Sequence, residues 1–493
     1  MDWNRRLPHR AVLALILVFG FCVRAATFQS PILDHQGWRQ ADTAAISRAF
    51  AEERYNILYP QVDWRGAAAT GYVETGLELH AFLVATIARF SRFKAETGRL
   101  LSAVFFLVSC SLVWAFTRRR YGDATGLFAA YLYAFGFPLM LFMERAFMNE
   151  ALLVCLSLTS LVAAQRYLEA TDTGAAGVTR RRWSALVIVI GATALIGAVK
   201  VPYLIVLAPI TGLFIERHGA RALVRPELWA VSLCAIGAAA LWYQHAHALG
   251  VESGLTFGLA DKVSSVDLLL SERFYRMVSQ RILRDILGPL GAIGIAAGAI
   301  IAFRYRRWAE CLGLAGFAFY VMLVGGGNLA HNYYQLAMMP IAPTVVAAGL
   351  LGAIERIGPL RRAAPIAITT VLVLIPLITT VRSASFHSWY EIPERDVHIC
   401  ATLPDHFTSP TERMVQIGSG DPRFLFCLDR KGWLLNPDDE ARVRAAWEQG
   451  ARIALVHPET SEGVLTFLRE HGDAVPLPGE LRAFRLREPP RLP

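Results

Sequence analysis

The sequence has little charge for its length. Only 18% of its 493 residues are Asp, Glu, Lys or Arg, whereas 54% are hydrophobic and the mean hydropathy is +0.39. Soluble domains carry about 25% charged residues. This composition excludes a disordered chain, a coiled coil and an ordinary soluble domain. The seven cysteines are too few for a disulfide scaffold.

Lysine is scarce, and familiar cofactor motifs are missing. The net charge of +9 comes almost wholly from arginine, and the arginines are spread over short loops, which argues against a nucleic-acid partner. No Walker loop, strand–GxGxxG–helix unit, HExxH or CxxC pair occurs, so no soluble nucleotide or zinc site is predicted. We therefore expect no required cofactor and no dedicated metal site, while a divalent metal remains an open alternative.

Long apolar runs are abundant instead. Blocks of about 17–22 residues have the length that spans roughly 30 Å of hydrocarbon. They lie near 11–28, 100–117, 123–141, 147–168, 183–199, 201–216, 227–246, 286–303, 308–325, 333–353 and 363–382. These blocks predict an all-α, polytopic membrane protein with about eleven transmembrane helices.

The loop arginines predict the orientation of these helices. Arginine clusters occur at 5–10, 118–120, 180–182, 217–225, 304–307 and 356–362. With a cytoplasmic N-terminus, eleven spans place every cluster in the cytoplasm, as the positive-inside rule requires. The apolar stretch 77–90 would break this pattern as a span, so we interpret it as an interfacial or re-entrant helix.

The chain is predicted to have two domains, a transmembrane domain at 1–382 and an extracytoplasmic α/β domain at 383–493. Predicted strands in the second domain are 414–418, 453–457 and 481–486, and predicted helices are 438–449 and 461–470. Cys400 and Cys427 lie in this domain, where a disulfide and two free cysteines both fit the sequence.

The outer loop at 29–99 gathers side chains that can do chemistry. Asp34, His35, Trp38, Arg39 and Asp42 lie within nine residues, directly after the first apolar block. Residues 42–50 have helical spacing, which predicts a helix on the membrane surface. A carboxylate can accept a proton from an attacking hydroxyl, and a cation can stabilise a departing phosphate.

Further polar groups fall at the outer ends of predicted helices. They are Glu74, Arg145, Glu150, Lys200, His331 and Tyr333. Ionisable groups near membrane depth are costly and usually face a cavity or a partner. Their position predicts an extracytoplasmic cavity in which carboxylates and cations meet beside a lipid-binding groove.

At these residues the sequence resembles the bacterial family-39-like glycosyltransferases of the GT-C superfamily, whose relatives include protein O-mannosyltransferases and the lipid A aminoarabinose transferase. The resemblance rests on the run from His35 to Ala44, on Arg145 to Glu150 and on Asn328 to Gln335. It covers most of residues 10–355, and the tail more loosely resembles the small periplasmic domains of some members.

The resemblance implies an inverting transferase of the bacterial inner membrane. Its donor would be a polyprenyl-phosphate sugar and its acceptor an extracytoplasmic glycan, lipid or protein. Asp34 would be the base or position the acceptor, and Glu150 would be the second acid. Donor contacts fall on His35, Arg39, Lys200 and His331, and acceptor or supporting contacts on Trp38, Asp42, Glu74, Arg145 and Tyr333.

The sequence departs from the family pattern at two places. Where relatives have Glu-Lys-Pro, this chain has Glu74-Thr75-Gly76, so the phosphate contact of that lysine has to come from another residue. Candidates are Arg39, Lys200, His331 and the arginines of 273–284. Many relatives also have two adjacent acids where this chain has Asp34-His35, which argues against a two-carboxylate metal site.

Three other functions remain as alternatives. A transporter or flippase would show repeat symmetry and mid-span charges, neither of which is evident. A ligase or polymerase acting on lipid-linked oligosaccharides would favour a larger outer loop than 247–285. In a structural membrane protein, neither Asp34 nor Glu150 would matter for activity. The sugar, the acceptor and the oligomeric state are not determined by the sequence.

Overall fold

The computed structural model describes residues 9–66, 70–170, 176–256, 262–356, 365–409, 411–477 and 479–489. Its contacts divide the chain into two compact units. The helical unit comprises residues 1–28, 99–244 and 258–388, and the mixed unit comprises 29–98, 245–257 and 389–493, each within the described residues. The mixed unit therefore combines the first loop, residues 29–98, with the C-terminal part of the chain.

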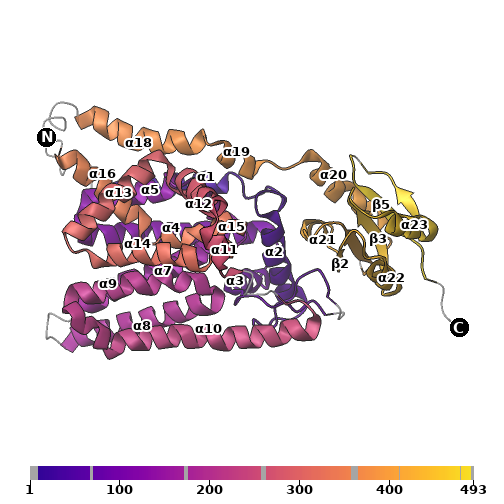
Figure 1. Ribbon diagram of the computed structural model, residues 1–493, viewed down its shortest axis with the longest axis horizontal. Coiled ribbons are helices and arrows are strands. Elements are labelled where there is room, and N and C mark those ends of the chain that lie inside the picture. Colours follow the sequence, from indigo (N-terminus) through magenta and orange to yellow (C-terminus); the bar gives the residue numbers. More distant parts are fainter. Residues whose placement is uncertain are drawn as a thin grey trace. The chain divides into compact units, whose positions relative to one another are not determined.

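The helical unit consists of long helices and short helical turns (Figure 1). Its elements are α1 (His9–Ala25), α4 (Ala95–Tyr121), α5 (Asp123–Phe135), α6 (Pro138–Met143), α7 (Glu150–Glu169), α8 (Ala176–Val199), α9 (Leu207–His218), α10 (Pro226–Ser253), α11 (Val266–Leu270), α12 (Glu272–Gln280), α13 (Gly288–Arg304), α14 (Trp308–Leu323), α15 (Gly325–Ala330), α16 (Ala342–Arg356), α18 (Pro365–Val381) and α19 (Ala384–Tyr390). The ends of three of these helices belong to the mixed unit, namely residues 95–98 of α4, 245–253 of α10 and 389–390 of α19.

Each of the eleven predicted apolar blocks contains a helix of the structure, and several of these helices are long and apolar enough to cross a membrane, as in a multi-pass membrane protein. By length and composition, five helices among the described residues can cross a membrane, or up to seven if each bent helix pair is one span. The predicted number of eleven spans is therefore not confirmed. The arginine clusters at 5–10 and 356–362, used to predict orientation, lie partly outside the described residues.

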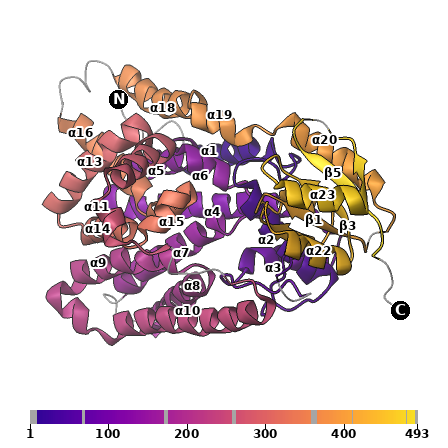
Figure 2. The ribbon, with the colours of Figure 1, turned by 45° about the vertical axis from the view of Figure 1, so that its right-hand side comes forward.

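Small residues let the helices approach closely. A Cβ atom on Gly298 of α13 would lie 2.1 Å from the carbonyl oxygen of Val345, and one on Gly349 of α16 would lie 2.1 Å from that of Gly294. Such close backbone contacts are typical of helix packing inside membranes. In both views α13 and α16 run beside each other (Figures 1 and 2).

Buried ion pairs join distant helices of this unit. The Arg24 guanidinium bonds the Glu144 carboxylate, and both side chains are fully buried. Arg120, part of the predicted 118–120 cluster, is also buried and pairs with Glu216 and Glu310 at 2.7 and 2.6 Å. Burial of one partner alone would be costly, so these pairs are structural.

The mixed unit contains a five-stranded sheet between two layers of helices. Its strands are β1 (Arg413–Ile417), β2 (Gly432–Leu435), β3 (Ala451–Val456), β4 (Gly472–Val475) and β5 (Arg482–Leu486), in the order β2-β1-β3-β5-β4. Strand β1 is parallel to β2 and β3, whereas β5 is antiparallel to β3 and β4. All three predicted strands are present, and β2 and β4 are additional.

Helices cover both faces of this sheet. Helices α22 (Glu440–Glu448) and α23 (Glu462–His471), both predicted, pack on one face with Val415, Trp433 and Phe484. Helices α20 (Glu394–Thr402) and α21 (Arg423–Cys427) pack on the other face. A disulfide joins Cys400 of α20 to Cys427 of α21 across 27 positions, which decides between the two alternatives that the sequence left open.

The first loop contributes two helices to the mixed unit, α2 (Gly37–Glu52) and α3 (Leu79–Ala88). Helix α2 is buried from Gln40 through Ser47, so it lacks the single apolar face expected of a helix lying on a membrane. Its polar residues find partners inside the protein instead. Helix α3 covers about 15 Å, too short to cross a bilayer. The predicted boundary between residues 382 and 383 stays a prediction.

Candidate functional site

Asp34 is held in the turn that leads into α2. Its side chain is buried, with 5% of the residue exposed, and its Oδ1 accepts a hydrogen bond of 2.7 Å from Gln40 Nε2. The same amide also donates to the carbonyl oxygen of His35 at 2.9 Å. The Asp34 carbonyl accepts the backbone N–H of Gly37 at 2.8 Å. The carboxylate therefore has a fixed direction on a rigid turn.

The Arg39 guanidinium lies beside Thr75, the residue that stands where the family pattern has a lysine. Its Nη2 donates to Glu78 Oε1 at 3.1 Å and to Thr75 Oγ1 at 3.4 Å, and the Thr75 hydroxyl donates to Glu78 Oε1 at 2.9 Å. Glu78 is fully buried while a quarter of the Arg39 side chain is exposed. Glu78 thus orients a guanidinium whose outer edge can reach a ligand.

Asp42, one turn further along α2, is a buried acid with an indole partner. Trp64 Nε1 donates to its Oδ1 at 3.1 Å. Burial raises the pKa of Asp42 to about 7, although the Arg39 charge and the Trp64 hydrogen bond both oppose that rise. Asp42 can therefore hold a proton near neutral pH.

The other predicted residues of the first loop are also in the mixed unit. Glu74 Oε2 pairs with Nδ1 of His247 at 3.2 Å. The Trp38 indole donates to the side chain of Gln36 at 3.1 Å. The ring of His35 stacks on Trp389, with centroids 5.4 Å apart. These contacts indicate that Glu74, Trp38 and His35 shape the site. They give less support to a direct contact between these residues and a phosphate.

A second group of predicted residues meets in the helical unit. Lys200 Nζ lies 2.6 Å from Glu150 Oε1. The same ammonium lies 4.5 Å from the ring centroid of Tyr333 and 4.6 Å from that of Tyr334. His331 stacks on both tyrosines, with centroids 5.2 and 5.6 Å apart. Four residues that the sequence predicted separately, Glu150, Lys200, His331 and Tyr333, therefore form one cluster.

Local sequence explains how these residues are placed. Glu150 begins α7, where a carboxylate is favoured by the helix dipole. Lys200 interrupts the helical chain between α8 and a 3₁₀ segment, Val201–Val206, whose second residue is a proline. Arg145 is buried in the turn before α7, with its guanidinium 4.4 Å from the ring centroid of Phe142. The buried Arg145 side chain therefore supports the turn before α7.

Several partners were not predicted. Gln40, Thr75 and Glu78 orient predicted residues, and Tyr334 completes the cation–π pair around Lys200. Glu78 lies 39 positions from Arg39 in sequence, so no local period marks this pair. Tyr334 is the exception, because its neighbour Tyr333 was predicted. The expectation that Asp34 and Glu150 line one cavity stays a prediction.

The donor set for a metal ion is sparse. Among the described residues, no group of three or more His, Cys, Asp or Glu side chains is arranged to hold a metal ion. Asp34, which is followed by a histidine and not by a second acid, accepts a hydrogen bond from Gln40.

Comparisons with known proteins address the fold. The family model described as dolichyl-phosphate-mannose-protein mannosyltransferase matches residues 79–243. The structure of ArnT from Cupriavidus metallidurans bound to undecaprenyl phosphate is similar with a TM-score of 0.64 and 13% identity, covering 96% of this chain and 97% of that chain. Its apo state gives a TM-score of 0.62, 14% identity and the same coverage.

An Archaeoglobus fulgidus oligosaccharyltransferase, tethered to an acceptor peptide containing the NVT sequon, is also similar, with a TM-score of 0.59 and 11% identity over 100% of this chain and 76% of that chain. The chain therefore shares its fold with ArnT and with this oligosaccharyltransferase. No curated protein sequence matches it. The fold likeness and the family match over a third of the chain both support the resemblance seen in the sequence.

Proposed function

We propose that this GT-C protein transfers a sugar from a polyprenyl-phosphate donor to an extracytoplasmic acceptor. The observation that carries the proposal is the buried Asp34 carboxylate, fixed by Gln40 in a loop that also presents the Arg39 guanidinium. ArnT, whose fold is similar, binds undecaprenyl phosphate, which supports a lipid-phosphate donor.

In the proposed reaction, Asp34 accepts the proton of the acceptor hydroxyl as its oxygen attacks the anomeric carbon. The bond between that carbon and the phosphate oxygen breaks, and the polyprenyl phosphate leaves with the bonding electrons. The new glycosidic bond forms on the opposite face of the sugar, so the configuration is inverted. A buried carboxylate on a rigid turn suits this role because proton transfer needs a fixed donor–acceptor geometry.

Cations would stabilise the charge on the leaving phosphate. Arg39 supplies the contact that Thr75 cannot make, because its guanidinium lies beside the Thr75 hydroxyl. Lys200 of the helical unit is an alternative candidate for this contact. An ammonium has three N–H groups, so Lys200 can bind Glu150 and a phosphate oxygen together. Glu150 then orients Lys200 and does not act as a base.

We further propose that the enzyme resides in the bacterial inner membrane, with its N-terminus in the cytoplasm and the mixed unit in the periplasm. The disulfide between Cys400 and Cys427 supports this orientation, because disulfides persist in oxidising compartments and are rare in the cytosol. Neither a resident metal nor another cofactor has a part in the proposed reaction.

Transfer assays with purified protein test the proposal. The donors are radiolabelled undecaprenyl-phosphate hexoses and pentoses, and the acceptor is a delipidated cell-envelope fraction. We expect label to move from one of these donors to the acceptor, and Arg39→Ala to raise the KM for that donor more than the exposed control Arg487→Ala does. Transfer only from lipid-diphosphate oligosaccharides would overturn the proposal, and so would movement of intact donor across vesicles without chemistry.

A further inference from the structure

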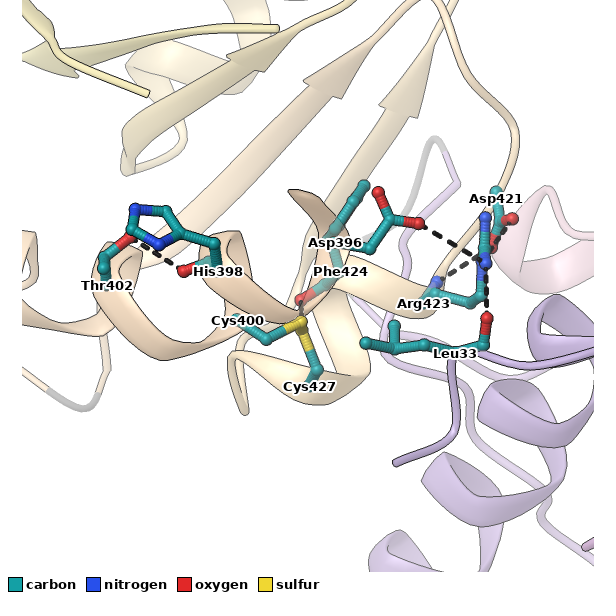
Figure 3. The surroundings of a disulfide bond; sticks show 9 residues. All are labelled: Leu33, Asp396, His398, Cys400, Thr402, Asp421, Arg423, Phe424 and Cys427. Carbon is teal, nitrogen blue, oxygen red and sulfur yellow. Dashed lines mark hydrogen bonds and ion pairs between the residues drawn. A yellow bond between two sulfur atoms is a disulfide. The ribbon is translucent and has the colours of Figure 1, made fainter. Parts of the chain in front are cut away.

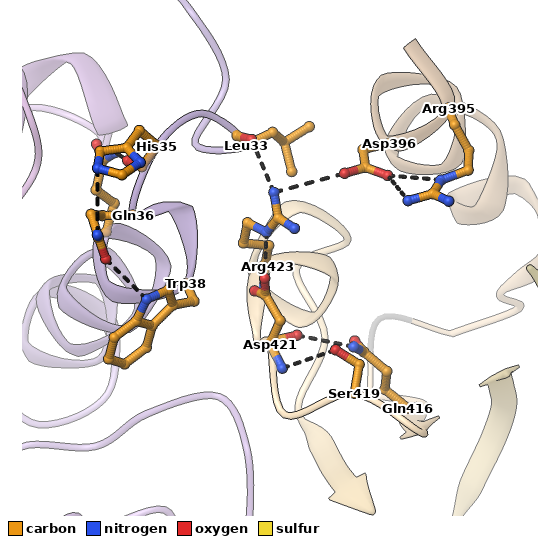
Figure 4. Close-up of polar contacts among 11 residues, drawn as sticks. Leu33, His35, Gln36, Trp38, Arg395, Asp396, Gln416, Ser419, Asp421 and Arg423 are labelled. Atoms are coloured by element: carbon orange, nitrogen blue, oxygen red, sulfur yellow. Dashed lines mark hydrogen bonds and ion pairs between the residues drawn. The ribbon is translucent and has the colours of Figure 1, made fainter. Parts of the chain in front are cut away.

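Arg423 of the C-terminal part of the chain contacts the segment that carries Asp34. Its Nη1 donates to the carbonyl oxygen of Leu33, the residue before Asp34, at 3.0 Å (Figure 4). The two residues are 390 positions apart in sequence. Arg423 begins α21 and its side chain is three-quarters buried. A side chain from the C-terminal part of the chain therefore reaches the turn that carries Asp34.

Two carboxylates fix the direction of the Arg423 guanidinium. Its Nε donates to Asp421 Oδ2 at 2.7 Å, and its Nη1 lies 3.7 Å from Asp396 Oδ2. The Asp421 backbone is itself held, since Gln416 Nε2 donates to its carbonyl oxygen at 3.0 Å. A planar guanidinium held by carboxylates on two sides loses little additional entropy when it binds a third acceptor. Arg423 is thus prepared to bind the Leu33 carbonyl.

The same segment makes two more contacts with the C-terminal part. The backbone N–H of His35 donates to the carbonyl oxygen of Trp389 at 3.1 Å, and the two rings stack. At Gly37, a Cβ atom would lie 2.5 Å from Cδ of Arg423. Three of the five residues from Leu33 to Gly37 thus lie directly against this part of the chain.

The turn itself needs support from outside. Gln36 adopts a left-handed conformation with φ of 56°, which a residue with a Cβ atom adopts only when its surroundings hold it. Gln36 lies between Asp34 and the first residue of α2. The Arg423 and Trp389 contacts flank this residue on both sides and supply the constraint.

A disulfide joins the helices that carry the ion pair. Asp396 lies on α20 and Arg423 on α21, and Cys400 and Cys427 link these two helices (Figure 3). The link keeps α20 close to α21, so that the Asp396 carboxylate stays within reach of the guanidinium.

From these contacts we infer that the C-terminal domain is a positioning module for the proposed base, with Arg423 as the positioning residue. The inference rests on the proposed function, because it assigns Arg423 the task of holding the turn from which Asp34 accepts a proton. Arg423 acts through the Leu33 carbonyl and the backbone at Gly37, not on the substrate.

A second attachment makes the inference testable without detaching the domain. The backbone N–H of Gly432 donates to the Asp63 carbonyl at 3.0 Å, and the N–H of Arg65 donates to the Gly432 carbonyl at 2.7 Å. Lys431 also pairs with Glu53. These contacts do not involve Arg423, so they persist when its side chain is changed.

The experiment compares Arg423→Ala, Arg423→Lys and Gly37→Ala with the control Arg487→Ala, whose exposed side chain pairs with Asp473 on the surface of the same domain. We expect Arg423→Ala to lower kcat by about 10- to 100-fold, the effect of a base displaced by about 1 Å, with little change in the KM for the donor. Arg423→Lys should lose less, and Gly37→Ala, which pushes against Arg423 from the loop side, should resemble Arg423→Ala.

Hydrogen–deuterium exchange supplies a readout that is independent of activity. In Arg423→Ala the amides of residues 34–40 should exchange faster, while those of β1, β3 and β5 keep their protection. Normal kcat, or unchanged exchange at 34–40, would overturn the inference. If Arg423→Ala loses protection throughout the sheet, Gly37→Ala decides, since its side chain lies outside the sheet domain. If wild-type protein transfers no sugar, the proposed function fails, and the exchange data still decide whether Arg423 holds the turn.

Discussion

Lys200 and Glu150 form a short, buried ion pair in the helical unit, with 2.6 Å between Nζ and Oε1. Only 3% of the Glu150 side chain and 17% of the Lys200 side chain are exposed. Two tyrosine rings cover the ammonium. The pair therefore brings together a carboxylate and a cation that lie 50 positions apart in sequence. The two tyrosines beside it, Tyr333 and Tyr334, follow a third helix, α15.

The first prediction concerns the stability of this pair. Lys200→Met should lower the free energy of unfolding by about 3–5 kcal/mol, because it leaves a buried carboxylate without its partner. The double variant Glu150→Gln/Lys200→Met should recover most of that loss. Thermal unfolding in detergent measures both, with the exposed Lys94→Met as control. Additive losses in the double variant would show that the two charges do not depend on each other.

The second prediction concerns Asp34. Asp34→Asn should lower kcat by about 10²- to 10⁴-fold, since it removes the proposed base while keeping the size of the side chain and its hydrogen bond to Gln40. Single-turnover transfer from the labelled donor measures the change. Asp405→Asn, at an exposed position of the C-terminal domain, serves as the matched control. Equal rates for Asp34→Asn and wild type would remove Asp34 from the mechanism.

The third prediction uses the raised pKa of Asp42. Its pKa is about 7 in the folded protein against an ordinary 3.8, so the folded state binds a proton that the unfolded state has lost. The contribution of Asp42 to stability is therefore greatest below about pH 4, falls as the pH rises to about 7 and is constant above it. The total loss is at most about 4 kcal/mol.

Asp42→Asn removes this dependence. The variant should match wild type near pH 4 and be more stable than wild type above pH 7, where the wild-type carboxylate is buried and charged. Unfolding midpoints between pH 4 and 8 test this, with Asp405→Asn as the exposed control. If wild type instead became more stable as Asp42 ionises, the predicted direction of the pH dependence would be wrong.

The fourth prediction concerns the disulfide. Cys400→Ser/Cys427→Ser should lower the stability of the C-terminal domain by about 2–4 kcal/mol, because the bond closes a loop of 27 positions. Chemical unfolding of the purified protein, followed by hydrogen exchange in the sheet, measures the loss. Maleimide labelling of intact cells, before and after reduction, checks the compartment: new labelling at these two positions after an impermeant reductant places them outside the cytosol, and labelling without reduction contradicts the bond.

The fifth prediction concerns metals. Chelation with EDTA should leave kcat and the KM for the donor unchanged, because the carboxylate of Asp34 pairs with Gln40 and the described residues hold no group of metal-ligating side chains. Transfer rates before and after dialysis against EDTA measure this. Loss of transfer that returns with Mg²⁺ or Mn²⁺ would establish a metal-assisted reaction.

Much of the architecture follows from local patterns in the sequence. Apolar runs of membrane length predict helices because lipid cannot satisfy a free backbone, and every predicted run contains one. The short apolar runs at 414–418 and 453–457 predicted the neighbouring strands β1 and β3. Strands β2 and β4 have only four residues each, which is too short to show a hydrophobic period. They are strands because they pair with β1 and β5 in the folded sheet.

The site was predicted less completely, for a physical reason. Residue type and position at a helix end identified Asp34, Glu150 and Lys200, because charge at membrane depth is costly. Their partners are set by tertiary contacts. Nothing near Gln40 marks it as the partner of Asp34, and nothing near Arg423 marks a contact 390 positions earlier. The helix at 42–50 was correctly predicted, but its burial was not, since Asp42 and its neighbours are enclosed by the protein.

The bridge between Trp64 and Gly432 has a consequence for biogenesis. The early segment around Trp64 lines the open side of β2, a strand made some 370 positions later. During synthesis on the ribosome, that early segment has no partner until all the intervening helices have been made. A transcript truncated before codon 432 would therefore yield a product whose opening loop is never completed, even though all of its own residues are present.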